Sequence, residues 1–274
     1  MPSPLAWLTA PCVMGILNVT PDSFSDGGEH LDPASAVGHA RRMAADGAAI
    51  VDVGGESTRP GAAHVPVDQE MARVVPVLKA LAADGAAVPV SIDTRHAAVA
   101  AVALDFGAVL VNDVSAGGDP GMFPLVADRG AGLCLMHMQG EPATMQDDPR
   151  YDDVVDEVAA FLEARMRAAV DAGVSEEAIL LDPGIGFGKT VQHNLALLDS
   201  LPRIVALGRP VLVGVSRKGI IGALTGREVG DRLAGSIGAG LAAVQAGAAV
   251  LRVHDVVETV DAMRAFTRTR GGGE

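Results

Sequence analysis

Short apolar runs that end on a polar residue recur eight times along the chain. Before most of them a helical pattern closes on glycine, as in ADGAAIVDVGG and VQAGAAVLRVHD. Strands and helices that alternate in this way indicate parallel βα units, and eight such units predict an α/β fold, the closed (β/α)8 barrel. The expected strands cover residues 12–17, 49–53, 88–92, 108–112, 132–136, 178–182, 211–215 and 249–253.

Helical patterns fall between these strands. We expect helices over 39–46, 68–83, 96–106, 119–128, 151–172, 194–207, 232–246 and 256–267. The connections at 18–33 and 54–67 are longer than a barrel requires, and their Gly, Pro, Ser, Thr and Asp content predicts loops. Both follow strands, as does 137–150, so all three lie on the face where barrel enzymes bind substrate.

Length and composition favour one domain over residues 1–274, with a core at about 12–267. The net charge of −13 argues against a nucleic-acid partner. Cys12 and Cys134 fall in separate strands without metal-ligand spacing, so we expect buried reduced thiols of a cytoplasmic protein. No apolar stretch approaches the roughly 18 residues of a membrane span, and the first residues do not have the basic start of a signal peptide.

The polar residues that end the strands are candidates for the active site, because chemistry in such barrels takes place where the strands end. Asp93, Asn112 and Asp182 end three strands. Two carboxylates and an amide at the top of a barrel suit a heterocycle that is rich in N–H donors. Asp182 has an alternative role, in which it caps a Pro–Gly turn. Because packed barrel residues would be apolar, several polar groups together favour a function.

The last two strands predict a site for an anion. Arg252 and His254 are two positions apart and therefore share a face, where they can bind a phosphate or diphosphate. The alternative is a structural ion pair of Arg252 with an aspartate such as Asp255. Asn18 and phosphate oxygens could hold a hard cation such as Mg²⁺.

The segment GVSRKG follows the seventh strand. Gly214, Ser216 and Lys218 lie on one face if that strand continues. Ser216 could instead cap the next helix, and Arg217 is expected to be solvated. The segment LDPGIGFGKT is rich in glycine but lacks the spacing of a P-loop, so it is a weak signal by itself.

Eight ordered motifs together resemble those of the dihydropteroate synthases, from about residue 13 to residue 266. They are GILNVTPDSFSDGG, DVGGESTRPGA, SIDT, VNDVS, MHMQG, LDPGIGFGK, GVSRKG and LRVHDV. The resemblance implies a sulfonamide-target enzyme of folate biosynthesis, usually a homodimer. It would join 6-hydroxymethyl-7,8-dihydropterin diphosphate to 4-aminobenzoate, and would release 7,8-dihydropteroate and pyrophosphate in an SN1-like, Mg²⁺-dependent reaction.

The same resemblance implies a role for each matching residue. The implied pterin-binding residues are Asp93, Asn112, Met136, Asp182, Gly214 and Lys218. The implied aminobenzoate-binding residues are Pro21, Phe24, Thr58, Arg59, Pro60, Phe187 and Ser216. The implied diphosphate-binding residues are Asn18, Arg252 and His254, with Asn18 also holding the metal, and the implied catalytic residues are Asp22, Lys218, Arg252 and His254. Two positions depart from the family pattern, because Ile220 stands where relatives often have an aromatic residue and His96 where a lysine is common.

Two other functions remain open at this point. A methyltetrahydrofolate-binding methyltransferase barrel that serves a corrinoid protein would share the pterin pocket. It would have no use for the STRPG loop or for the pair Arg252 and His254. A pterin-binding scaffold without catalysis is the second alternative. The presence of Asn18, Asp22, Arg59, Lys218 and His254 argues against it.

Overall fold

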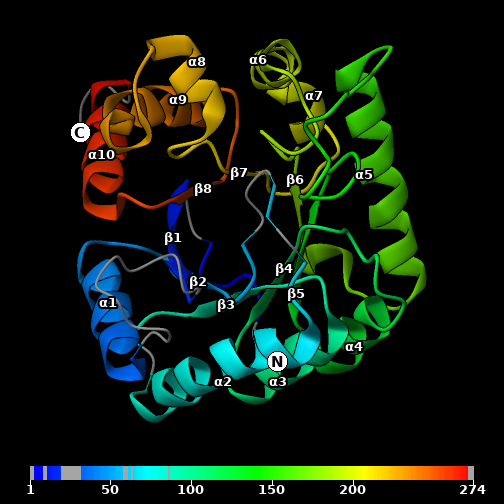
Figure 1. Ribbon diagram of the computed structural model, residues 1–274, viewed down its shortest axis with the longest axis vertical. Helices are drawn as coiled ribbons and strands as arrows, with labels where there is room; N and C mark the ends of the chain where they lie inside the picture. The colour runs from blue at the N-terminus through cyan, green and yellow to red at the C-terminus, as the bar shows by residue number, and fades with distance from the viewer. Residues whose placement is uncertain are drawn as a thin grey trace.

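Eight parallel strands form a nearly closed barrel inside a ring of helices (Figure 1). The computed structural model describes residues 3–8, 11–19, 32–57, 61–62, 64–85 and 87–270. The spatial order of the strands is β6-β5-β4-β3-β2-β1-β8-β7, and a single bridge from Leu181 to Val211 joins β6 to the start of β7. The strands are β1 (Cys12–Asn18), β2 (Ile50–Gly54), β3 (Val90–Asp93), β4 (Leu110–Asp113), β5 (Gly132–Met136), β6 (Ile179–Asp182), β7 (Leu212–Val213) and β8 (Val250–Val253). The predicted (β/α)8 barrel is thus confirmed.

Each predicted helix is present with different ends, and α8 (Gly219–Thr225) was not predicted. They are α1 (Pro33–Ala45), α2 (Val67–Ala83), α3 (Ala97–Asp105), α4 (Met122–Arg129), α5 (Val154–Asp171), α6 (Val191–Asp199), α7 (Leu201–Val205), α8 (Gly219–Thr225), α9 (Leu233–Gln245) and α10 (Val256–Arg270). Helix α1 begins before the expected residue 39, because the Asp32 side chain accepts from the Ser35 amide at 3.1 Å. The single helix expected over 194–207 is two helices, with Pro202 in the first turn of the second.

The interior of the barrel changes from apolar to polar along the strands. Its apolar layer consists of Leu5, Met14, Ile50, Leu110, Cys134, Leu180, Leu212 and Val250. Residues two positions further along a strand face the same interior. On β2, β4, β6 and β8 these are Asp52, Asn112, Asp182 and Arg252. The carboxyl ends of the strands therefore carry a polar layer directly above an apolar one, while a larger apolar core lies between the sheet and the helices.

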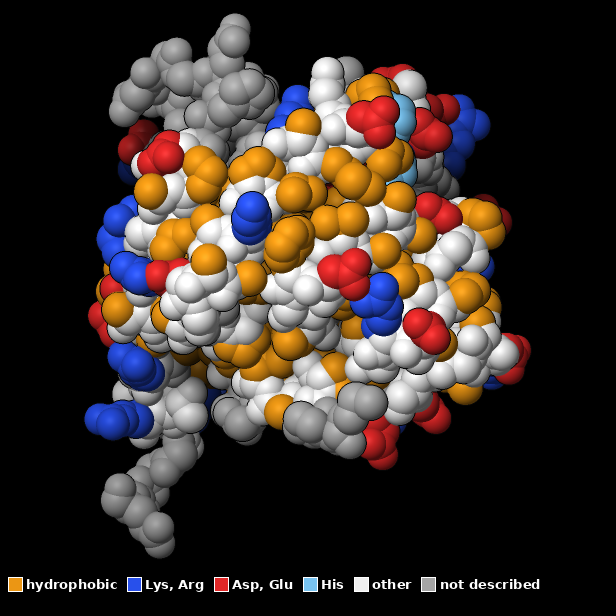
Figure 2. Space-filling view, turned by 90° about the horizontal axis from the view of Figure 1, so that it is seen from below, with side chains coloured by type: hydrophobic (Ala, Val, Ile, Leu, Met, Phe, Trp, Pro, Cys, Tyr) orange, Lys and Arg blue, Asp and Glu red, His pale blue; other side chains and the backbone are white. Residues whose placement is uncertain are grey.

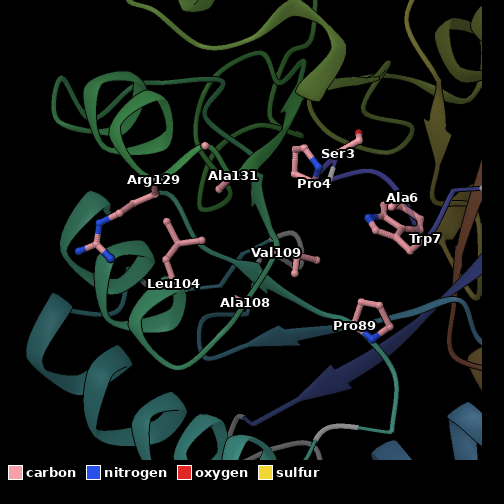
Figure 3. Close-up of a pocket in the computed structure, with 11 residues that line it drawn as sticks. Ser3, Pro4, Ala6, Trp7, Pro89, Leu104, Ala108, Val109, Arg129 and Ala131 are labelled. Atoms are coloured by element: carbon pink, nitrogen blue, oxygen red, sulfur yellow. The ribbon is translucent and has the colours of Figure 1, made fainter. Parts of the chain in front are cut away.

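A separate pocket lies at the amino ends of the strands, where Pro89, Val109 and Ala131 immediately precede β3, β4 and β5 (Figure 3). It has a volume of about 490 Å³ and is bounded on one side by Trp7 of the N-terminal segment. Because it lies at the opposite end from the polar layer, it contributes nothing to the site described below.

The outer surface carries features that bear on other sequence predictions. Apolar side chains run across the middle of the face in Figure 2, with only a few charged groups among them.

Both cysteines are free thiols; Cys134 is buried and Cys12 is half-buried. Among the helices of the described residues, none combines the length and the hydropathy that a membrane crossing requires.

Candidate active site

Side chains from four strands form one hydrogen-bonded network at the carboxyl end of the barrel. Asp52 Oδ2 accepts from Asn112 Nδ2 at 2.9 Å and from Arg252 Nε at 2.7 Å. Arg252 Nη2 donates to Asp93 Oδ2 at 2.7 Å. The ion pair that was considered for Arg252 is therefore present, but its partners are aspartates of β2 and β3 rather than Asp255. The network brings Asp93, Asn112 and Arg252 together, as the strand ends predicted.

Burial and charge act in opposite directions in this network. Burial raises the pKa of the Asp93 carboxyl, and the Arg252 guanidinium limits that rise. Burial alone would lower the pKa of Arg252, but the carboxylates of Asp52 and Asp93 raise it above its ordinary value. Asp52 is fully buried, and its Oδ1 has no hydrogen-bond partner among the described residues. Arg252 therefore stays charged, with two of its five N–H groups committed to aspartates.

A second part of the site lies across the junction of β6 and β7. Asp182 Oδ1 accepts from the Gly184 amide at 2.7 Å, so the turn cap that was considered for Asp182 is present. Lys218 Nζ donates to the Ile185 carbonyl and lies 4.5 Å from the centroid of the Phe187 ring. Burial lowers the pKa of Lys218 to about 8, and the Asp182 carboxylate opposes this shift. Burial raises the pKa of Asp182, and Lys218 opposes that shift in turn.

The glycine-rich segment after β6 packs closely against the end of β5. Gly184 has a φ of +67°, and a Cβ there would lie 1.8 Å from the His137 carbonyl oxygen. Only glycine allows both this backbone conformation and this approach. The motif DPGIGFG therefore shapes the wall that carries Phe187.

Lys189, which has no assigned role in the sequence prediction, fixes this wall. Its Nζ lies 2.9 Å from His137 Nδ1 and donates to the carbonyls of His137 at 3.2 Å and Phe187 at 2.9 Å. Burial lowers the pKa of Lys189 to about 7. Burial and the neighbouring Lys189 lower the pKa of His137 to about 3, so the imidazole is neutral and Nδ1 accepts.

We expect the stability of the native protein to rise with pH more steeply than that of a Lys189→Met variant between pH about 7 and about 9. Above the lowered pKa of about 7 the folded chain has released this proton, whereas the unfolded lysine keeps it to about 10.5. The unfolded state thus binds more protons, and unfolding becomes less favourable as pH rises. Urea denaturation across this range measures the effect. The control is Lys79→Met, at an exposed lysine of α2. Identical pH profiles for native protein and Lys189→Met would contradict it.

The end of β7 differs from the prediction. This strand stops at Val213, so it does not continue through Ser216 and Lys218. Ser216 does not cap the next helix, because α8 starts after Lys218. Instead, Ser216 Oγ lies 3.1 Å from His254 Nδ1 and accepts from the His254 amide at 3.2 Å. Arg217 is exposed, as expected, and also pairs with Asp255.

The structure brings together many of the predicted site residues, while others lie outside the described residues. Those at the carboxyl end of the barrel are Asn18, Asp93, Asn112, Met136, Asp182, Gly214, Ser216, Lys218, Arg252 and His254, with Phe187 in the adjoining loop. Pro21, Asp22, Phe24, Thr58, Arg59 and Pro60 lie outside the described residues. Asp52 and His137 are among the polar residues that end the apolar runs and were candidates for the site on that ground, but neither they nor Lys189 had a specific predicted role. Asp52 lies near the end of β2 and His137 directly follows β5, and these positions were the available signal.

Known proteins share this chain's sequence over almost its whole length. The profile of the family described as pterin binding enzyme matches residues 14–254. Dihydropteroate synthase of Escherichia coli (strain K12) is 47% identical over 267 residues, which cover 97% of this chain and 94% of the relative. The chain belongs to the dihydropteroate synthase family. It is therefore a transferase, and the methyltransferase and non-catalytic alternatives lose their support.

Other dihydropteroate synthases agree with this assignment. The Mycobacterium leprae enzyme is 51% identical over 265 residues, which cover 92% of this chain and 91% of the relative. The structure of the Xanthomonas albilineans enzyme with 4-aminobenzoic acid is 50% identical, with a TM-score of 0.91 over 97% of this chain and 95% of that one. The dihydropteroate synthase family thus accounts for both the sequence and the barrel.

Proposed function

We propose that this chain joins 6-hydroxymethyl-7,8-dihydropterin diphosphate to 4-aminobenzoate, releasing 7,8-dihydropteroate and pyrophosphate. The observation that carries the proposal is the polar layer of Asp93, Asn112, Asp182 and Arg252 above an apolar barrel interior. Structures of the Xanthomonas albilineans relative with 4-aminobenzoic acid and with 7,8-dihydropteroate support it.

The pterin would bind through its N–H groups. Asn112 donates its amide N–H to Asp52, which leaves its Oδ1 as an acceptor for the ligand. Asp182 supplies a buried carboxylate, and Met136 on the paired strand β5 offers an apolar contact for the ring. Gly214 keeps open the space beside Lys218 and Arg252, because a Cβ there would lie 3.6 Å from Lys218 Nζ. Acceptors on one side and an apolar face on another suit a flat heterocycle.

The diphosphate would lie toward β1 and β8. Arg252 has N–H groups beyond those bound to Asp52 and Asp93, and His254 follows the same strand. Gly54 has no side chain beside two oxygens that could bind a metal ion. A Cβ at this position would lie 3.8 Å from Asn18 Oδ1 and 3.6 Å from Asp93 Oδ2. This oxygen-donor chemistry fits Mg²⁺, with Asn18 as the protein ligand and phosphate oxygens as the others. When bound, Mg²⁺ would neutralise charge on the departing pyrophosphate.

The reaction follows from these positions. The bond between the pterin methylene carbon and the diphosphate oxygen breaks, and Arg252 with His254 stabilises the charge that develops on that oxygen. The electron-rich pterin delocalises the resulting cation. The aminobenzoate nitrogen then forms the new C–N bond and loses a proton. We propose that no covalent intermediate with the enzyme forms.

A pyrophosphate-release assay tests the function. We expect release, together with formation of 7,8-dihydropteroate, only when both substrates are present. Pterin binding without any release in the presence of 4-aminobenzoate and Mg²⁺ would contradict the proposed reaction while preserving the pterin site.

Asp52→Asn should lower kcat/KM for the pterin substrate by about 10- to 100-fold, because Asp52 orients both Asn112 and Arg252. Hydrogen bonds to charged groups contribute about 1.5–3 kcal/mol, which corresponds to that range. The KM for 4-aminobenzoate should change little, and this difference separates positioning from general loss of structure. Steady-state kinetics with each substrate varied measures both effects, with exposed Asp171→Asn as the matched control. Equal effects on both substrates would argue against this role.

A further inference from the structure

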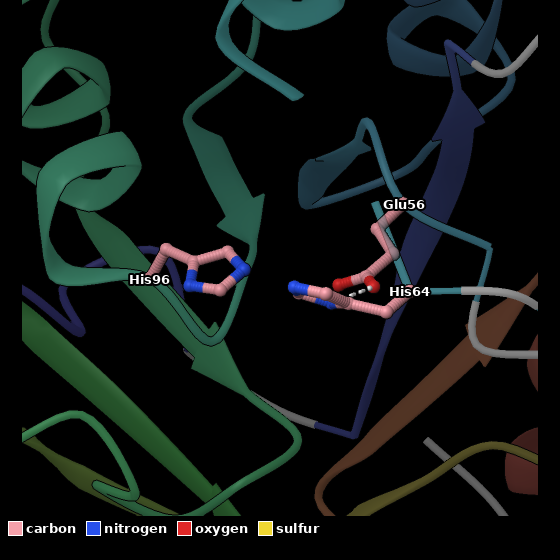
Figure 4. A group of neighbouring side chains, drawn as sticks. All are labelled: Glu56, His64 and His96. Atoms are coloured by element: carbon pink, nitrogen blue, oxygen red, sulfur yellow. Dashed lines mark hydrogen bonds and ion pairs between the residues drawn. The ribbon is translucent and has the colours of Figure 1, made fainter. Parts of the chain in front are cut away.

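A second cluster of titratable side chains lies beside, but outside, the network described above. Glu56 and His64 belong to the segment between β2 and α2, and His96 lies between β3 and α3. One ligand atom from each of the three residues lies within 4.8 Å of the other two. The two imidazole rings turn a nitrogen toward each other beside the Glu56 carboxylate, with ring centroids 5.6 Å apart (Figure 4).

A buried carboxylate without a hydrogen bond faces the same cluster. Glu70 of α2 is fully buried, and the part of the chain that the structure describes places no hydrogen-bond partner on either of its oxygens. Burial raises the pKa of the Glu70 carboxyl to about 7, and the side chain of Thr94 opposes this rise. Glu70 Oε2 lies 3.8 Å from His96 Nε2, a buried nitrogen that has no hydrogen-bond partner within the described ranges. Buried polar atoms are normally paired, so this arrangement calls for a positively charged partner.

We propose that Glu56, His64 and His96 bind a divalent transition-metal ion of the zinc type, with Glu70 as a further carboxylate beside His96. Two imidazoles and a carboxylate form a ligand set that suits Zn²⁺. Mg²⁺ prefers oxygen ligands, so this site differs in kind from the one beside Asn18. The His64 side chain is 56% exposed, which gives an ion access from solvent.

Arg95 balances the charge of the cluster when no ion is bound. Its Nη2 donates to Glu56 Oε1 at 2.9 Å and lies 2.6 Å from His64 Nδ1. Glu56 also accepts from the Val65 amide at 3.0 Å, so its carboxylate stays in place if Arg95 moves away. A metal ion and the Arg95 guanidinium therefore compete for the same carboxylate and imidazole. This competition follows from the metal site alone and does not depend on the proposed reaction.

Zinc titration of the full purified chain tests the site, with a chromophoric chelator as competitor and Mg²⁺ in excess. We expect one Zn²⁺ per chain and a rise in the unfolding temperature on binding. His64→Gln and His96→Gln should each weaken zinc binding at least about tenfold, by loss of one of a few ligands. His39→Gln, at a partly exposed histidine of α1, is the matched control and should leave the affinity unchanged.

Two further results bear directly on the proposal. Arg95→Gln should tighten zinc binding, because it removes the competing cation, and Co²⁺ should give an absorption spectrum of histidine coordination that His96→Gln abolishes. Zinc affinity that is the same in native protein, His64→Gln and His96→Gln would overturn the site. Weaker zinc binding in Arg95→Gln would contradict the proposed competition between the Arg95 guanidinium and the metal ion. Since His64 is largely exposed, its variant stays folded and keeps the test decisive.

Discussion

Asp182→Asn should lower kcat/KM for the pterin substrate by about 10²- to 10⁴-fold. This is the largest effect that we expect from replacing a carboxylate by an amide in this site. The carboxylate is buried at the end of β6, where it can accept two N–H groups of a planar ligand. Each hydrogen bond to a charged acceptor contributes about 1.5–3 kcal/mol, and two together give this range. Asparagine keeps the volume and an acceptor for the Gly184 amide, so the loop after β6 should keep its shape.

Calorimetric titration with a pterin ligand, together with steady-state kinetics, measures this effect. Asp199→Asn makes the same chemical change at an exposed position on α6 and serves as the control. If Asp182→Asn bound the pterin with native affinity, the pterin would not lie against β6. The proposed arrangement of the substrates would then be wrong.

Arg252→Met should damage both stability and catalysis. The substitution leaves the buried carboxylates of Asp52 and Asp93 without their cation, and breaking a buried pair in this way costs about 3–5 kcal/mol. For a chain of this size that corresponds to a fall in Tm of about 10 °C. The loss of charge opposite the leaving diphosphate should also lower kcat by about 10²- to 10³-fold.

Thermal unfolding and kinetics separate the two effects of Arg252→Met. The matched control is Arg203→Met on α7, whose side chain is 52% exposed and whose Nε lies 3.5 Å from an exposed aspartate. An unchanged Tm in Arg252→Met would show that the two aspartates do not depend on this cation. A fall in Tm with full kcat would place the diphosphate elsewhere.

The barrel and the location of its site were predictable from hydrophobic periodicity. Asp93, Asn112 and Asp182 each follow an apolar strand, and parallel strands of a barrel deliver such residues to one end. The chemical nature of the ligand was not predictable from spacing. It required the resemblance of whole motifs to a family.

The partners of individual side chains were less predictable. Sequence proximity suggested Asp255 for Arg252, yet the actual partners are Asp52 and Asp93, from strands two and three places away from β8 in the barrel. Such pairs depend on strand register and side-chain rotamers, which leave no periodic signal. The early start of α1, in contrast, had a readable signal in Asp32 and Pro33 that our helix prediction passed over.

The junction between β6 and β7 gives substrate binding a structural role. Here β7 has two residues, and one bridge joins the neighbouring strands, whereas other neighbouring strands share longer registers. Asp182 stands on one side of this junction and Lys218 on the other. A pterin that binds both residues would bridge β6 and β7, where the sheet has the least backbone pairing between neighbouring strands. The ligand would then complete the barrel, and amide hydrogens along β6 and β7 would gain their full protection from exchange only in the occupied enzyme.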